Sequence, residues 1–173
     1  MLAREVPPMS RSIFVHIVSA GVLVLALAGP ISAQSSSPFK IEGTLNDYTD
    51  ASNATAGPWH ITAEWSAELR GRSGHVDFLA SLTMVRSQSG ASSHTHHVSL
   101  SDATVTPIAG GHRISGDVVV TTNGTVGFTG SHLDVDITGG TTLPLSNIKL
   151  TFTGPAAGHF GEGPIEGVVS LQR

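Results

Sequence analysis

Hydrophobic and polar residues alternate along most of this chain. In residues 58–70, PWHITAEWSAELR, every second residue from Trp59 to Leu69 is apolar, and the residues between them are polar or charged. Residues 74–86, GHVDFLASLTMVR, show the same period. Successive side chains of a β-strand point to opposite faces. The alternation therefore predicts strands with one buried face and one exposed face.

Short glycine-containing segments separate these runs and mark the turns. Asn123-Gly124 is the strongest turn signal, because both central residues of a two-residue hairpin turn take positive φ, which Asn and Gly tolerate. The remaining segments are residues 71–74, Gly110-Gly111, Gly139-Gly140, a loop at residues 47–57, and a loop holding Pro155, Gly158 and Gly161 before the last run. With an early strand at residues 39–46, these signals predict about eight strands in an antiparallel meander.

A meander of this length can protect its edge strands by closing into a barrel. Several predicted strands reach 11–13 residues, which is long for a small sandwich. We therefore expect an all-β domain, with a closed antiparallel β-barrel favoured over a two-sheet β-sandwich. Gly57-Pro58-Trp59 resembles the Gly-x-Trp that opens the lipocalin barrel. That resemblance covers three residues and implies a lipocalin-like fold.

The first 33 residues have the pattern of an export signal. Arg4 and Arg11 precede an apolar run at residues 13–29, and a small residue, Ala33, follows Pro30. This order is typical of a secretory signal peptide. It predicts a signal at residues 1–33, cleavage near Ala33, and a single domain at residues 34–173 that is secreted or periplasmic. The alternative is an uncleaved membrane anchor. The chain has no cysteine, so neither disulfides nor a lipid on cysteine can contribute.

The charge of the chain excludes two classes of partner. Its formal net charge is −4, and removal of residues 1–33 leaves seven Lys and Arg against twelve Asp and Glu. The chain has only two lysines, Lys40 and Lys149. Without a basic stripe, neither nucleic acid nor an anionic membrane surface is an expected partner. Membrane contact is expected only through the export signal.

Residues 92–100, SSHTHHVSL, contain three histidines, and two of them, His94 and His96, form the candidate metal site. His94 and His96 share the parity of Val98 and Leu100, so they are expected to face the barrel interior, whereas His97 faces the other way. Imidazoles at i and i+2 of a strand can converge on one zinc or copper ion. The pair is similar to those in α-carbonic anhydrases and Cu/Zn superoxide dismutases. The third ligand is left open among His75, His112, His132, His159, Asp77 and Glu162. Antiparallel pairing of the neighbouring runs would place Met84 and Arg86 near His94, and His75 and His112 far from it, so the neighbouring strands supply no obvious third histidine. The alternatives are polar histidines at a loop–strand junction and a pH-sensitive cluster.

Large side chains on the apolar faces form a second candidate site. Trp59, Trp65, Phe78 and Met84 either line a cavity for a ligand or pack as core. The sequence carries no Gly-x-Ser-x-Gly motif, and no catalytic residue is assigned. The leading interpretation is a binding module for a small apolar or amphipathic ligand. The alternative is a metal-binding protein or metal-dependent enzyme centred on His94 and His96, and the third is a structural or cell-surface interaction domain. The sequence does not set the oligomeric state.

Overall fold

The computed structural model describes residues 39–49, 58–69, 74–86, 92–139 and 145–172. All of them fall within one compact unit, Ser35–Arg173. The predicted signal peptide lies outside the described residues, as do most of the predicted loops at residues 47–57 and 71–74. Within the described part of the chain, no helix has the length and apolar character needed to cross a membrane.

The described residues form mostly β-strands, as the alternation predicts. In chain order the elements are β1 Phe39–Tyr48, β2 Trp59–Leu69, β3 His75–Arg86, β4 His94–Ile108, β5 Gly111–Asp117, β6 Val119–Thr122, β7 Thr125–Gly127, β8 His132–Gly139, β9 Leu145–Thr153, the 3-10 helix η1 Gly154–Ala156, α1 Ala157–Phe160 and β10 Ile165–Gln172.

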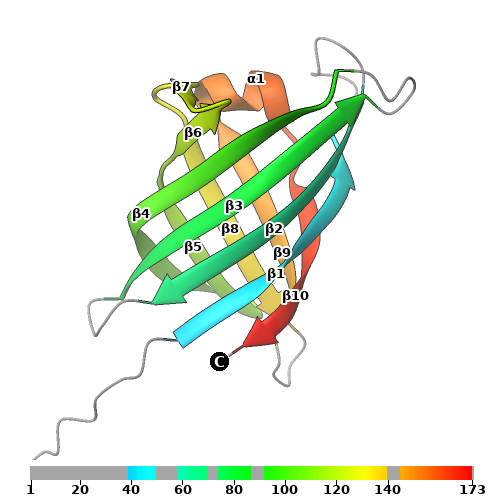
Figure 1. The fold of residues 1–173 in the computed structure, drawn as a ribbon. Helices are drawn as coiled ribbons and strands as arrows, with labels where there is room; N and C mark the ends of the chain where they lie inside the picture. The colour runs from blue at the N-terminus through cyan, green and yellow to red at the C-terminus, as the bar shows by residue number, and fades with distance from the viewer. Residues whose placement is uncertain (1–38, 50–57, 70–73, 87–91, 140–144, 173) are drawn as a thin grey trace, which may run out of the picture. The chain divides into compact units, whose positions relative to one another are not determined.

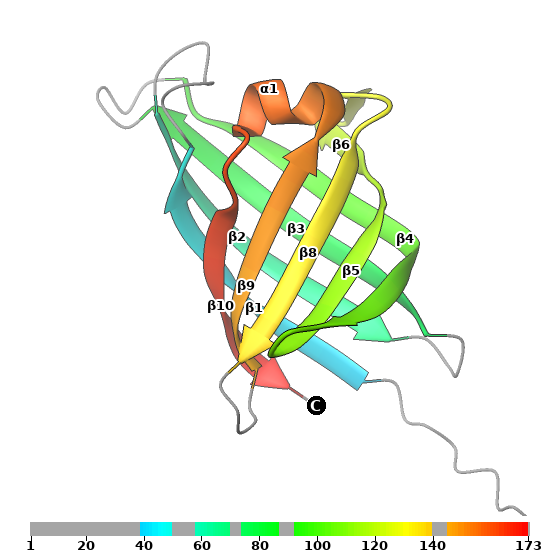
Figure 2. The ribbon, with the colours of Figure 1, turned by 180° about the vertical axis from the view of Figure 1, so that it is seen from behind.

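Eight of the strands close into an antiparallel barrel, which confirms the favoured fold (Figures 1 and 2). The strands follow the order β3-β2-β1-β10-β9-β8-β5-β4, and β4 pairs back with β3. β1 pairs with β10, so the first and last strands are neighbours in the wall. β6 and β7 are additional strands: β6 pairs with the first part of β4, and β7 pairs with β6. Trp59 begins the second strand of the barrel rather than the first.

Inward-facing apolar side chains fill the barrel. The alternation in β2 and β3 has the predicted parity, with Trp59, Trp65, Phe78 and Met84 all buried. Large and deeply buried residues come from seven of the eight barrel strands: Leu45, Ile61, Leu82, Leu100, Leu133, Ile137, Ile148, Leu150 and Ile165. Removing this apolar surface from water is the main source of folding free energy in a chain without disulfides.

A β-bulge interrupts the alternation of β4. Phe78 pairs with Leu100, but Val76 pairs with Ala103, so β4 has one extra residue between these pairs. Asp102, with φ of 57°, occupies the bulge. Its backbone N–H donates to Asp77 Oδ1 at 2.9 Å. The bulge changes the parity of β4, so that Leu100 and Ala103 are both buried.

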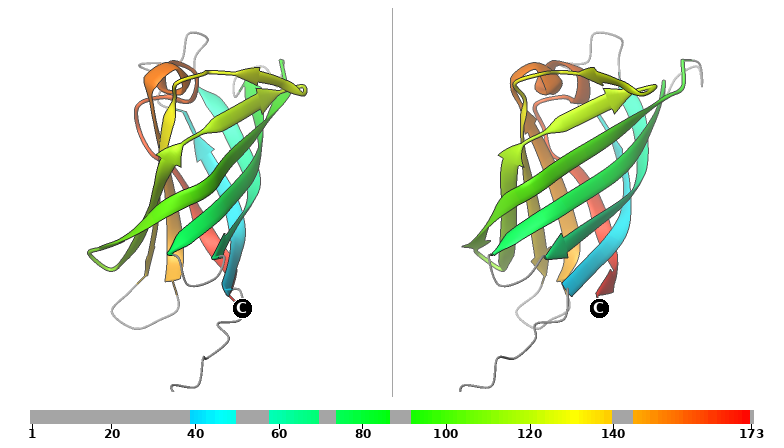
Figure 3. Two further views of the ribbon diagram at one scale, coloured as in Figure 1. Left: turned by 90° about the vertical axis from the view of Figure 1, so that its left-hand side faces the viewer. Right: turned by 60° about the vertical axis from the view of Figure 1, so that its left-hand side comes forward.

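The turns and connections agree only partly with the sequence prediction. Asn123 and Gly124 have φ values of 51° and 80°, as the predicted hairpin turn requires. The predicted turns at Asn123-Gly124 and Gly139-Gly140 leave one uninterrupted run, residues 125–138, between them, but a turn at residues 128–130 divides it into β7 and β8. The loop expected around Pro155 and Gly158 contains η1 and α1. Both differences lie at the end of the barrel where α1 is located (Figure 3).

Replacement of Trp65 by alanine is expected to destabilise the barrel strongly. The side chain is 3% exposed, and its ring stacks on Phe78 with centroids 6.1 Å apart. Deletion of a buried aromatic costs about 3–5 kcal/mol. Urea unfolding of Trp65→Ala measures the loss. Leu79→Ala is the control, because Leu79 is 56% exposed and surface changes usually stay within about 0.5 kcal/mol. Equal losses in both variants would contradict the assigned parity.

Candidate metal centre

His94 and His96 lie at the start of β4 and face into the end of the barrel. His94 pairs with Met84 of β3, and His96 lies between Leu82 of β3 and Thr122 of β6. His96 is 1% exposed, and His94 is partly buried. The alternation of β4 turns His97 to the outer face, where its Nδ1 lies 2.9 Å from Ser81 Oγ. The orientation of the pair is therefore the one that the sequence predicts.

The segment after β9 brings a third histidine, His159, to this pair. Gly154 has φ of 73°, and a side chain there would place its Cβ 2.9 Å from the Gly130 carbonyl oxygen. Glycine therefore allows the chain to turn tightly after β9. Ser131 fixes the turn, because its Oγ accepts from the Ala156 N–H at 2.8 Å and donates to the Phe128 carbonyl at 2.7 Å. α1 then carries His159 across the barrel end (Figure 3).

The Nε2 atoms of the three histidines converge. His159 Nε2 lies 3.3 Å from His94 Nε2 and 2.9 Å from His96 Nε2. One ligand atom from each residue lies within 4.8 Å of the other two. Two nitrogens bound to one tetrahedral zinc ion are about 3.3 Å apart, given Zn–N bonds of about 2.0–2.1 Å. The two separations from His159 are therefore close to the spacing of ligands around one ion, and the remaining one, between the strand histidines, is within 4.8 Å.

The outer nitrogens of the two strand histidines orient their rings. His94 Nδ1 lies 3.1 Å from the Ser92 carbonyl oxygen, and His96 Nδ1 lies 2.7 Å from Thr122 Oγ1. A carbonyl only accepts, so His94 donates from Nδ1, and in its neutral ring Nε2 keeps a free lone pair. One N–H on His159 Nε2 cannot serve both neighbours well. When His96 and His159 also carry their protons on Nδ1, the lone pairs of all three Nε2 atoms face the shared space, as a metal ion requires.

Burial and mutual proximity favour the neutral imidazoles of His96 and His159. Burial first, and then the charges of His159 and His94, lower the pKa of His96 to about 4. Burial and the charge of His94 also lower the pKa of His159. The neutral imidazole is the form that binds metal. At neutral pH, protons therefore compete weakly for the Nε2 atoms of His96 and His159.

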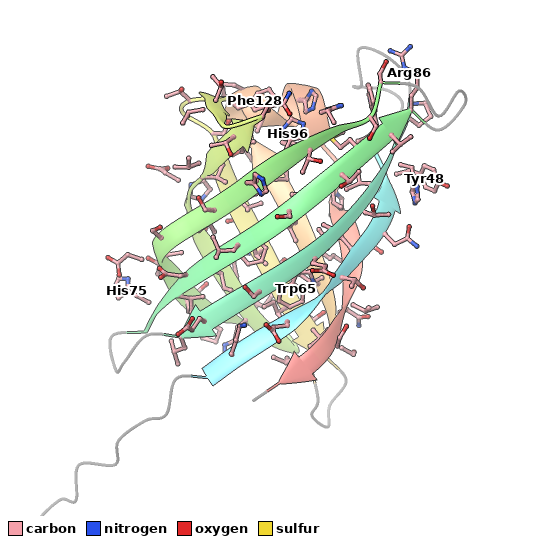
Figure 4. All side chains as sticks on the ribbon, in the orientation of Figure 1. Tyr48, Trp65, His75, Arg86, His96 and Phe128 are labelled. Atoms are coloured by element: carbon pink, nitrogen blue, oxygen red, sulfur yellow. The ribbon has the colours of Figure 1, made fainter. Side chains whose placement is uncertain are left out.

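Aromatic rings surround the histidines and restrict their orientation. Phe128 stacks on His159 with centroids 5.1 Å apart, and Phe160 packs edge-on against His96, also at 5.1 Å. Trp59 packs edge-on against His94 at 4.9 Å. Phe128 has φ of 53°, a backbone conformation rarely adopted by a bulky residue. This strained position places its ring against His159 (Figure 4 labels Phe128 beside His96).

The other candidate third ligands lie elsewhere. His75 is at the opposite end of the barrel, as Figure 4 shows, where its Nδ1 lies 3.0 Å from the Asp102 carbonyl oxygen. His112 pairs with Pro107, at the far end of β4 from His94. His132 lies near Asp117, with 3.3 Å between Nδ1 and Oδ1. Among the described residues, the converging set consists of His94, His96 and His159, without Asp77 or Glu162.

Of the four residues predicted to line a ligand cavity, two lie beside the histidines and two lie deeper in the barrel core. Trp59 contacts His94, and Met84 is the cross-strand partner of His94. Trp65 and Phe78 lie further along β2 and β3, stacked on each other. All four belong to the same buried cluster. Whether they bind a ligand stays a prediction.

Comparison with known proteins gives no family or function for this chain. No protein-family model, curated protein or solved structure matches this chain. The geometry of the site is therefore the basis for a functional proposal.

The lowered pKa of His96 predicts that the metal-free protein loses stability in mild acid. Folded His96 takes up its proton near pH 4, whereas an imidazole in the unfolded chain does so near 6.5. Between these values the unfolded chain binds more protons, so the free energy of unfolding falls as the pH drops. Urea unfolding with chelator present, at pH 7 and pH 5, measures the loss. His96→Asn keeps a partner for Thr122 and should lose less. An identical loss in this variant would contradict the assignment.

Proposed function

We propose that this protein binds one transition-metal ion, zinc or copper, through Nε2 of His94, His96 and His159. The observation that carries the proposal is the convergence of the three rings at the end of the barrel: one nitrogen of each lies within 4.8 Å of the others, and His159 Nε2 is 3.3 and 2.9 Å from Nε2 of His94 and His96. The rings come from two segments more than sixty residues apart in sequence. Histidines that meet through the fold in this way form a more specific feature than a cluster within one loop.

The chemistry of the three ligands supports a transition metal. Imidazole nitrogen suits zinc, copper, nickel and iron, whereas calcium and magnesium take oxygen ligands. Contacts with Ser92 and Thr122 orient His94 and His96 in the manner of the supporting hydrogen bonds found around metal-bound histidines. Three protein ligands leave one coordination position for water or another molecule. We assign metal binding and leave catalysis unassigned.

A small-molecule ligand inside the barrel is the less favoured function. The interior positions of β2, β3, β8 and β9 hold large side chains that are buried against one another. Small eight-stranded barrels commonly fill their interior in this way. The export signal proposed for residues 1–33 would place the metal site outside the cytoplasm, in a secreted or periplasmic protein.

Metal analysis of protein produced without a histidine tag tests the proposal. After treatment with chelator and its removal, we expect titration with Zn²⁺ or Cu²⁺ to saturate at one ion per chain. Ligand binding to the folded state alone stabilises it, by about 2.7 kcal/mol when free metal is a hundred times the Kd. The unfolding temperature should therefore rise with added metal.

Two variants and one matched control separate this site from incidental binding by surface histidines. His96→Asn and His159→Ala should each abolish stoichiometric uptake, because each removes one of three ligands. His97→Ala should leave uptake unchanged, since His97 neighbours His96 in sequence but faces outward to Ser81. Circular dichroism verifies that each variant is folded. Unchanged uptake in folded His159→Ala would contradict the three-histidine site.

A further inference from the structure

We infer that the ion is copper in its monovalent state, Cu(I), and that Met84 supplies a thioether ligand beside the three histidines. The inference rests on the proposed function, because it concerns the same site. Two independent features carry it: the charge of the surroundings of the site, and the position of the single methionine of the barrel.

The surroundings of the site favour a low charge on the ion. Imidazole binds a metal ion as a neutral ligand, and within the described residues no carboxylate joins the three histidines. The cost of burying an ion grows steeply with its charge unless an opposite charge accompanies it. A monovalent ion leaves one positive charge in this site, whereas Zn²⁺ or Cu²⁺ leaves two.

A nearby arginine strengthens this preference. The guanidinium of Arg86 lies over the ring of Trp59, 5.4 Å from its centroid, and the same ring contacts His94. Figure 4 places Arg86 at the end of the barrel that also holds His96. Arginine stays charged at all relevant pH values. A divalent ion at the histidines therefore experiences stronger repulsion from this cation than a monovalent one.

Met84 provides the soft ligand that Cu(I) prefers. It is the only methionine after residue 9 of the chain. It is fully buried and pairs with His94 across β3 and β4. Directly paired residues have Cβ atoms about 4.5–5.5 Å apart, a distance that an unbranched methionine side chain can span. Thioether sulfur selects Cu(I) over harder ions.

Competition titrations test both parts of the inference. Cu(I) is supplied anaerobically with ascorbate in the presence of a chromophoric Cu(I) chelator, and Zn²⁺ is titrated separately against a zinc indicator. We expect one tightly bound Cu(I) per chain and weaker binding of Zn²⁺. Met84→Leu conserves volume and should weaken Cu(I) binding by about tenfold or more, the loss seen even for groups that support metal ligands. Its zinc affinity should be unchanged.

Phe78→Leu is the matched control, because Phe78 is also buried on the inner face of β3 but lies among residues remote from the histidines. It should leave Cu(I) affinity unchanged. X-ray absorption at the copper edge gives a second readout: a sulfur neighbour in the wild type that disappears in Met84→Leu. Zinc binding as tight as Cu(I) binding, or nitrogen-only coordination of copper, would overturn this inference and leave the metal site standing. Absence of stoichiometric binding of either metal would overturn both.

Discussion

The orientation of β4 is the constraint on which the rest of the structure depends. This strand contributes two of the three converging histidines and pairs along its length with β3, β5 and β6. Its first half must point His94 and His96 inward, and its second half must bury Ala103. Strict alternation cannot satisfy both halves, because Leu100 and Ala103 have opposite parity. The bulge at Asp102 resolves the conflict with one extra residue.

The alternation of apolar and polar residues, together with the turn residues, was enough to predict most of the strands of the barrel. Alternation set the buried faces of β2 and β3, and the turn residues set the hairpins, because both depend on neighbours in the chain. The same reasoning predicted that Met84 lies beside His94 and that His112 lies far from it. Closure of the barrel followed from the number and length of the strands rather than from any single motif.

The rest of the site depends on contacts that no local pattern encodes. His159 was one of six candidate third ligands, and its place depends on Gly154, Ser131 and the turn at Phe128 acting together. The glycines and proline around α1 predict a loop. A helix of one turn is too short to show the repeating pattern of apolar residues by which a helix is recognised in a sequence. Gly154 and Gly161, both at positive φ, lie on either side of α1 and allow the chain to change direction sharply there.

His94 and His159 are 65 positions apart in the sequence, and the chain has no cysteine with which to tie such distant segments together. An ion held by both residues would tie α1 to β4, and because it binds only where the fold brings these rings together, its binding free energy would be lost on unfolding. Such an ion would therefore act as a reversible staple, fastening the end of the barrel where a covalent bridge is unattainable.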